Sequence, residues 1–141
     1  MSIRADRYTI NTKQVEAYSD FTLNFDLNPI TGFLAKVTNE DSVKQALKSI
    51  ILTQRTERLY NKYVGTRLRS LMFEPMDSVT EESIKSEILE SIKNNESRVF
   101  NVSCTAEAKP NDNAYAVTIY FEIINIPDQN FSLSLILKRV R

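Results

Sequence analysis

The sequence contains no histidine and only one cysteine, so two side chains common in catalytic and metal sites are nearly absent. Without histidine the chain lacks the usual general base near neutral pH and the commonest transition-metal ligand. A single cysteine, Cys104, cannot form an intramolecular disulfide, and its place between Val102 and Ala106 predicts that it fills one face of a strand. We expect no catalytic residue, no metal site and no cofactor.

Glycine is scarce as well, and the chain has no excess of either charge. Gly32 and Gly65 stand alone, whereas loops that hold phosphate groups need clustered glycines. The 18 basic and 18 acidic side chains cancel, which removes the electrostatic drive toward nucleic acid or anionic lipid. No apolar run approaches the length of a membrane span, and the first seven residues lack the apolar core of a signal peptide. We therefore expect no nucleic-acid partner, no membrane partner and assembly in a cytosol-like setting.

The length of 141 residues and the apolar fraction of 42% fit one globular domain. The first 17 residues alternate only weakly, and we predict an N-terminal arm over residues 1–17 and a single domain over residues 18–141.

Period-two alternation predicts the strands. It begins with a half-buried strand over Phe21–Leu27, closed by a turn at Asn28–Gly32. Further strands are predicted at Val99–Ala108 and Ala114–Asn125, and a last one carries Phe131, Leu133, Leu135 and Leu137 on one face. Turns are expected at Pro110–Asn113 and Pro127–Asn130, and such short turns imply antiparallel neighbours.

Two long helices are predicted from apolar residues that repeat with helical spacing. The first runs from about Asn39 to Thr56, and its stripe contains Val43, Ala46, Leu47, Ile50 and Ile51. The second has Thr80 as its N-cap, a staple between Val79 and Ile84, and an end at Asn94–Asn95; its stripe is Ile84, Ile88, Leu89 and Ile92. A short helix near Leu68–Phe73 ends before Pro75. The fold class predicted is α+β, with two main helices packed on a small antiparallel sheet and the C-terminal strand at a sheet edge.

The exit of the second long helix carries two opposite charges, Glu96 and Arg98, on what we predict to be extended backbone. Side chains at i and i+2 of extended backbone lie on the same side, so this pair could offer an acceptor and a forked donor to one partner. The alternative is two solvated charges at a helix exit.

The C-terminal strand ends in Lys138, Arg139, Val140 and Arg141, and such charges often protect the edge of a sheet. The functional alternative is an edge reserved for strand addition by a partner. The residues of that candidate edge are Phe131, Ser132, Leu133, Ser134, Leu135, Ile136, Leu137, Lys138 and Arg139.

Two other groups of side chains have ordinary interpretations. The glutamates at 74, 81, 82, 87, 90 and 96 are numerous, but most fall on the outer face of the second long helix, so a solvated face is favoured over a glycosidase pair. The basic and aromatic residues around Tyr60 and Tyr63 favour protein contact or local packing over nucleic-acid binding.

Taken in order, several segments resemble the small baseplate wedge subunit of contractile-tailed bacteriophages, a family that includes the T-even wedge subunit and sheath-initiator subunits of type VI secretion baseplates. The matching segments are Tyr18–Asp20, Asn28–Gly32, Asp41–Ile51, Tyr63–Leu68 and Leu71–Glu74. The sharpest family mark is a Glu-Pro-Arg triplet at the exit of the second helix, which here reads Glu96-Ser97-Arg98. The missing proline implies a less rigid motif.

This resemblance implies partners and a role. It implies that Glu96, Ser97 and Arg98 contact the helical core bundle of the wedge, and that the last strand takes up strands of the tail sheath protein. We therefore predict a structural subunit, not an enzyme, present in multiple copies around the tail axis of a virion. Assembly would occur in the host cytoplasm, and the subunit would template the first sheath ring. The alternatives are a peptidoglycan-degrading, lysozyme-like tail protein and a regulatory adaptor of the same fold.

Overall fold

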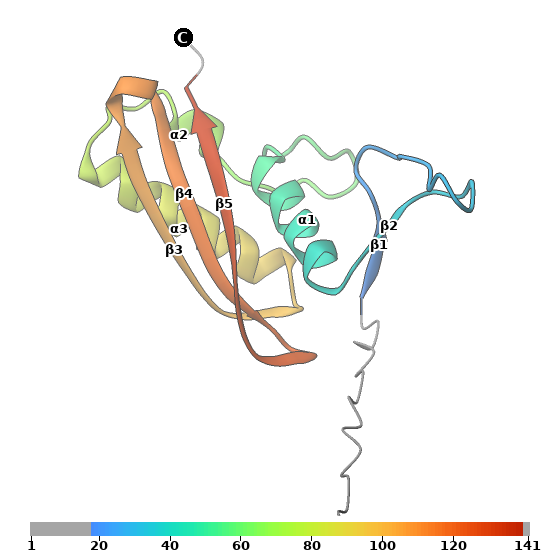
Figure 1. Ribbon diagram of the computed structural model, residues 1–141. Helices are drawn as coiled ribbons and strands as arrows, with labels where there is room; N and C mark the ends of the chain where they lie inside the picture. Colours follow the sequence, from blue (N-terminus) through green and yellow to red (C-terminus); the bar gives the residue numbers. More distant parts are fainter. Residues whose placement is uncertain (1–17, 140–141) are drawn as a thin grey trace, which may run out of the picture.

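The computed structural model describes residues 18–139, so the predicted arm over residues 1–17 lies outside the described part of the chain. Two sheets and three α-helices follow one another along the sequence (Figure 1). Their bounds are β1 Ser19–Phe21, β2 Lys36–Thr38, α1 Asn39–Leu52, α2 Leu68–Leu71, α3 Ser78–Asn95, β3 Val99–Lys109, β4 Ala114–Ile123 and β5 Ile126–Lys138, with a 3-10 turn at Pro110–Asp112. No helix in this described part is long and apolar enough to cross a membrane.

The larger sheet has the order β3-β4-β5 and is antiparallel throughout. β4 lies in the centre, and its side chains alternate as the sequence predicts, with Tyr115, Val117 and Ile119 on the buried face. β5 forms one edge of the sheet. The predicted α+β class and the edge position of the C-terminal strand are confirmed.

The core lies between this sheet and the two long helices, with α3 running behind β3 and β4 in Figure 1. The helical stripe of α3 is fully buried at Ile84, Ile88 and Ile92. α1 packs against α3 and also reaches β5, where the Nζ of Lys44 lies 5.8 Å from the ring centroid of Phe131. Burial of these apolar side chains supplies the main stabilising free energy of the fold.

α1 ends at Leu52, four residues before the predicted end at Thr56. The returning chain explains the early end, because the amide of Thr66 donates to the carbonyl of Thr53 at 2.9 Å. Gly65 passes so close that a Cβ there would lie 2.5 Å from the same oxygen. A helix continuing past Leu52 would lose this contact, so tertiary packing overrides the helical pattern.

α3 begins earlier than predicted, and its N-cap is Asp77, not Thr80. The carboxylate Oδ1 of Asp77 accepts a hydrogen bond from the amide of Thr80 at 2.8 Å, which satisfies a free donor of the first turn. Val79 therefore lies inside the helix and is 71% exposed, so the predicted staple with Ile84 does not form. The predicted helix end at Asn95 is confirmed.

The last β-turn also differs from the prediction. β4 ends at Ile123 and β5 already begins at Ile126, so residues 127–130 belong to the strand and not to a turn. The pairs Glu122↔Asn130 and Ile123↔Ile126 show a register shift between them. Such an irregularity is where a sheet tolerates a proline, which cannot donate to the ladder.

The segment Phe21–Leu27 is not a half-buried strand. β1 covers only Ser19–Phe21, after which the amide of Phe25 donates to the carbonyl of Thr22 at 3.0 Å and the chain turns. Phe25 has a φ of +54°, which interrupts the extended backbone that the alternation requires. The apolar side chains of the segment are consequently 48–67% exposed. The predicted turn at Asn28–Gly32 does form, closed by a hydrogen bond from the Gly32 amide to the Asn28 carbonyl at 2.8 Å.

Candidate docking sites

The two charges at the exit of α3 bind each other. Glu96 follows the helix with extended backbone, at φ −129° and ψ 99°, but Ser97 and Arg98 form a turn and not the extended backbone that the sequence predicts. The Nε of Arg98 donates to Oε1 of Glu96 at 2.7 Å, and its Nη2 donates to Oε2 at 2.6 Å. The sequence interpretation left both charges open to a partner, whereas here the forked donor and its acceptor are already matched.

Neighbouring residues hold this ion pair in place. Glu96 is buried, with 7% of its side chain exposed, while Arg98 keeps 28% exposure. The guanidinium lies over the ring of Tyr18, 5.4 Å from its centroid, and the Arg98 carbonyl accepts from the amide of Ile124 at 3.0 Å. The hydrogen bond to Glu96 raises the pKa of Arg98. The helix exit therefore presents exposed Ser97 beside a fixed, partly exposed guanidinium.

The outer edge of β5 has no strand partner among the described residues. The amide of Arg139 donates toward β4, to the carbonyl of Asn113 at 3.0 Å. Because inward and outward main-chain groups alternate along an antiparallel strand, the outward amides belong to Ser132, Ser134, Ile136 and Lys138. The side chains of Phe131, Leu133, Leu135 and Leu137 all pack on the core, as predicted, and the alternate side chains are exposed.

The last predicted residue of that edge lies differently. β5 ends at Lys138, and Arg139 turns toward the end of α2, where its Nε donates to the carbonyl of Met72 at 2.6 Å. A groove of about 450 Å³ lies beside the same end of β5 and includes Leu52, Phe73 and Ile136 in its lining. Arg139 thus fixes β5 against α2 and does not continue the edge.

The opposite edge of the sheet is partly closed. The amide of Ala108 in β3 donates to Oε1 of Glu81 in α3 at 2.8 Å, so a helical carboxylate takes up a main-chain donor of the edge strand. The register of β3 also shifts between Phe100 and Ser103, where Asn101 has a φ of +48°. Cys104 lies beyond this irregularity, and burial raises the pKa of its thiol to about 11, which fits the predicted packing role.

Sequence reasoning missed one buried charge, Glu87, which is only 5% exposed. Its Oε1 accepts from the amide of Arg67 at 2.9 Å, and its two oxygens lie 3.2–3.3 Å from the guanidinium groups of Arg67 and Arg55. Burial alone would raise the pKa of Glu87, but the hydrogen bonds from Arg67 and the two positive charges outweigh it and lower the pKa. The available signal was its position on the buried stripe of α3, next to Ile88.

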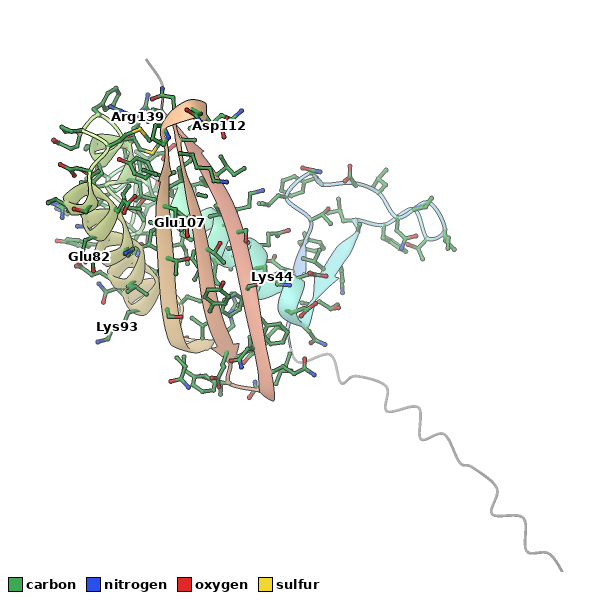
Figure 2. The ribbon with its side chains drawn as sticks, turned by 60° about the vertical axis from the view of Figure 1, so that its left-hand side comes forward. Lys44, Glu82, Lys93, Glu107, Asp112 and Arg139 are labelled. Carbon is green, nitrogen blue, oxygen red and sulfur yellow. The ribbon has the colours of Figure 1, made fainter. Side chains whose placement is uncertain are left out.

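These carboxylates do not fit a glycosidase site. A general acid needs a raised pKa, whereas Glu87 has a lowered one and both oxygens of Glu96 are bound by Arg98. Glu82 and Lys93 lie on the outer side of α3, as Figure 2 shows, in agreement with the predicted solvated face. Within residues 18–139, no three acidic or cysteine side chains gather in a way that could hold a metal ion.

Solved structures of tail-like assemblies share this fold. A candidate tail lysozyme from Geobacter sulfurreducens aligns with a TM-score of 0.66 and 19% identity, over 72% of this chain and 92% of that one. A chain of the anti-feeding prophage baseplate gives 0.60 and 16% identity, over 88% and 87%. A chain of the type VI secretion baseplate complex gives 0.56 and 10% identity, over 69% and 92%. Identities this low show a shared fold and do not carry over any role or activity.

The sequence comparisons are more specific. The pattern of the family described as "Baseplate wedge protein gp25" matches residues 37–128, more than half of the chain, and the chain belongs to this family. The baseplate wedge protein gp25 of Enterobacteria phage T4 is 28% identical over 87 residues, which are 62% of this chain and 66% of the relative, just under two thirds of its length. The family consists of structural baseplate proteins, so this chain is a structural component of a tail baseplate.

Proposed function

We propose that this chain connects the baseplate wedge to the tail sheath. Its helix exit at Glu96, Ser97 and Arg98 docks on the helical core of the wedge, and the outer edge of β5 takes up a strand of the sheath protein. The first ring of sheath is then built on this edge. The observation that carries the proposal is the open edge of β5 in a member of a baseplate wedge family.

Main-chain hydrogen bonding suits the edge to this task. The outward groups of Ser132, Ser134, Ile136 and Lys138 alternate regularly, since the pairing with β4 has no shift between Asn130 and Lys138. An added strand would therefore find an uninterrupted ladder. The groove beside Ile136 offers apolar space for side chains of such a strand and would contribute to its selectivity.

A proline at an outward position tests strand addition without disturbing the fold. Ser134→Pro removes one outward amide and leaves the ladder with β4 intact. We expect this variant to fold and to join wedges, yet to lose sheath nucleation in a reconstitution with the sheath protein, whereas the matched Ser134→Ala nucleates normally. Normal nucleation by a folded Ser134→Pro protein would contradict strand addition at β5.

Docking of the helix exit needs a test that spares the ion pair, because Arg98→Ala would leave Glu96 buried without a partner. Ser97 is exposed between the two charges, so Ser97→Trp obstructs the surface while the pair remains. We expect Ser97→Trp to lose co-purification with the wedge core proteins and Ser97→Ala to retain it. Equal retention by both folded variants would refute docking through this exit.

A further inference from the structure

A second groove, of about 420 Å³, is lined by residues of α1 and of the segment that begins in β1. α1 and the short β1-β2 sheet lie side by side (Figure 1). One wall is the segment Asp20–Phe25, α1 contributes half-buried Ala46 and buried Ile50, and Arg58 and Val64 of the following loop complete the lining. Asn95, the last residue of α3, lines it as well, so the groove is continuous with the helix exit.

Three apolar side chains line this groove without being buried by the chain itself. Phe21 is 48% exposed, Leu23 is 54% exposed and Phe25 is 67% exposed. The backbone turns at Phe25, so these side chains do not form one face of a strand, but together they leave an apolar patch at the groove that the described chain does not cover. Exposed apolar patches of this kind mark interaction surfaces.

The main chain of this wall is already occupied. β2 pairs with one side of β1, and on the other side Gln45 of α1 makes two hydrogen bonds. Its Nε2 donates to the carbonyl of Phe21 at 2.6 Å, and its Oε1 accepts from the amide of Leu23 at 3.3 Å. A partner therefore finds no free strand edge here and must bind through side chains, which favours a helix, whose own main-chain groups are satisfied internally.

The charges at the groove define that helix further. Among the described residues, Arg58 has no ion pair and no hydrogen bond, so it is a cation available to a partner. Asp20 instead accepts a hydrogen bond from the neighbouring amide of Phe21 at 2.8 Å. We propose that the groove binds an amphipathic helix of the wedge core whose apolar face covers Phe21, Leu23 and Phe25 and whose acidic side chain pairs with Arg58. This inference rests on the proposed docking of the helix exit and extends its surface.

Site-specific photocrosslinking distinguishes helix binding in the groove from docking at the helix exit alone. The photoreactive residue p-benzoylphenylalanine replaces Leu23 in the groove, Ser97 at the helix exit, or Ile30, which is 91% exposed on the same segment but does not line the groove. Each full-length variant is assembled with the wedge core proteins of the same tail and irradiated, and the crosslinked peptides are identified by mass spectrometry. We expect strong crosslinks at Leu23 to one helical segment and only background at Ile30.

Affinity measurements provide the second readout. Leu23→Asp and Arg58→Glu are expected to weaken wedge binding about tenfold or more, and Ile30→Asp less than about twofold, since exposed residues outside the contact are nearly neutral. Crosslinks at Ser97 with only background at Leu23 would overturn the groove but leave the helix-exit docking intact. Background at both positions would overturn both. Crosslinks from Leu23 to a second copy of this chain, or to a non-helical segment, would overturn the helix as occupant.

Discussion

The two edge strands of the three-stranded sheet, β3 and β5, differ in how far their outer main-chain groups are free to pair. Along β3, the register shifts near Asn101 and the carboxylate of Glu81 binds the Ala108 amide. Along β5, the pairing runs without a shift from Asn130 to Lys138, and no described strand pairs with the outer side. Edge strands are normally protected against adding further strands. Here α3 occupies one main-chain donor of β3 and a register shift interrupts that edge, while the outer edge of β5 is regular and unpaired among the described residues.

The difference arises from side chains outside the sheet. α3 runs beneath β3 and supplies Glu81, and Cys104 in β3 lies near enough to Lys85 and Glu82 that their charges influence its pKa. β5 instead has α1 beside it, which contacts the buried face through Lys44 and Phe131. A strand edge is thus open or closed according to what the adjacent helix places on its amides.

The largest expected effect tests the register of β5. Leu135→Pro should remove a ladder hydrogen bond to β4 and a packed side chain, and destabilise the protein by roughly 3–4 kcal/mol. Ser134→Pro, one residue away, should cost less than about 1 kcal/mol, because its amide faces outward. Urea unfolding of the two variants measures this contrast. Equal losses would mean that the inward and outward amides are assigned wrongly.

The next effect concerns the support of β5 through α2. Glu87 holds Arg67 next to α2, and α2 in turn accepts Arg139 at the end of β5. Glu87→Gln should reduce stability by about 2 kcal/mol at neutral pH, which is less than the roughly 3–5 kcal/mol for breaking a fully buried pair, because Arg67 is 64% exposed. Chemical denaturation is the measurement, and an unchanged midpoint would show that the cluster contributes little.

This cluster also predicts a pH dependence. The pKa of Glu87 is lowered below 4.5 in the folded protein, so the unfolded chain binds the proton more tightly. Its contribution is therefore fully present above pH 4.5 and is lost as the pH falls through the lowered pKa. The difference in stability between the parent and Glu87→Gln should shrink over that acidic range. A difference that stays constant with pH would contradict this role for the carboxylate.

A smaller effect tests the closed edge. Glu81→Ala should cost about 1–1.5 kcal/mol, because the Ala108 amide loses a charged acceptor, and it should promote association of the protein through β3. Glu82→Ala is the matched control, since Glu82 is 71% exposed and its pair with Lys85 is worth less than about 0.5 kcal/mol. Thermal unfolding and sedimentation report the two consequences. Equal behaviour of the variants would show that Glu81 does not protect the edge.

The smallest effect lies where the chain enters β3. Glu96 already has the extended backbone that a residue before proline prefers, so Ser97→Pro should raise stability by about 0.5–1 kcal/mol. The substitution introduces the proline of the Glu-Pro-Arg triplet that the sequence resemblance names. A lower melting temperature would mean that the turn at Ser97 cannot accept the ring.

The regular parts of this architecture were predictable, because burial produces periodicity. The alternation of β4 and the stripe of α3 follow directly from the core that they share. The exposed segment after Phe21 has the same periodicity but turns at Phe25, and the sequence pattern alone cannot tell a buried face from an exposed one. Asp77 is the N-cap and Thr80 is not, because the chain turns after Pro75 and brings the Asp77 carboxylate to the Thr80 amide. The sequence pattern does not reveal this turn.

The sequence predicted where the candidate sites lie, but not which of their polar groups are already bound within the chain. Charge and spacing located Glu96 and Arg98, but their mutual ion pair depends on burial beside Tyr18, which is distant in sequence. The edge role of β5 followed from strand order, whereas the closure of β3 by Glu81 required the placement of α3. Docking and strand addition stay predictions until they are measured.

Amide exchange followed by NMR tests the central claim most directly, namely that the outer edge of β5 receives a sheath strand. In the free protein, the amides of Ser132, Ser134, Ile136 and Lys138 should exchange rapidly, while those of Leu133, Leu135 and Leu137 should be protected by β4. Addition of the sheath protein should protect the first set and leave β3 unchanged. Unaltered exchange of that set in a complex that nevertheless forms, or new protection along β3 instead, would contradict the account.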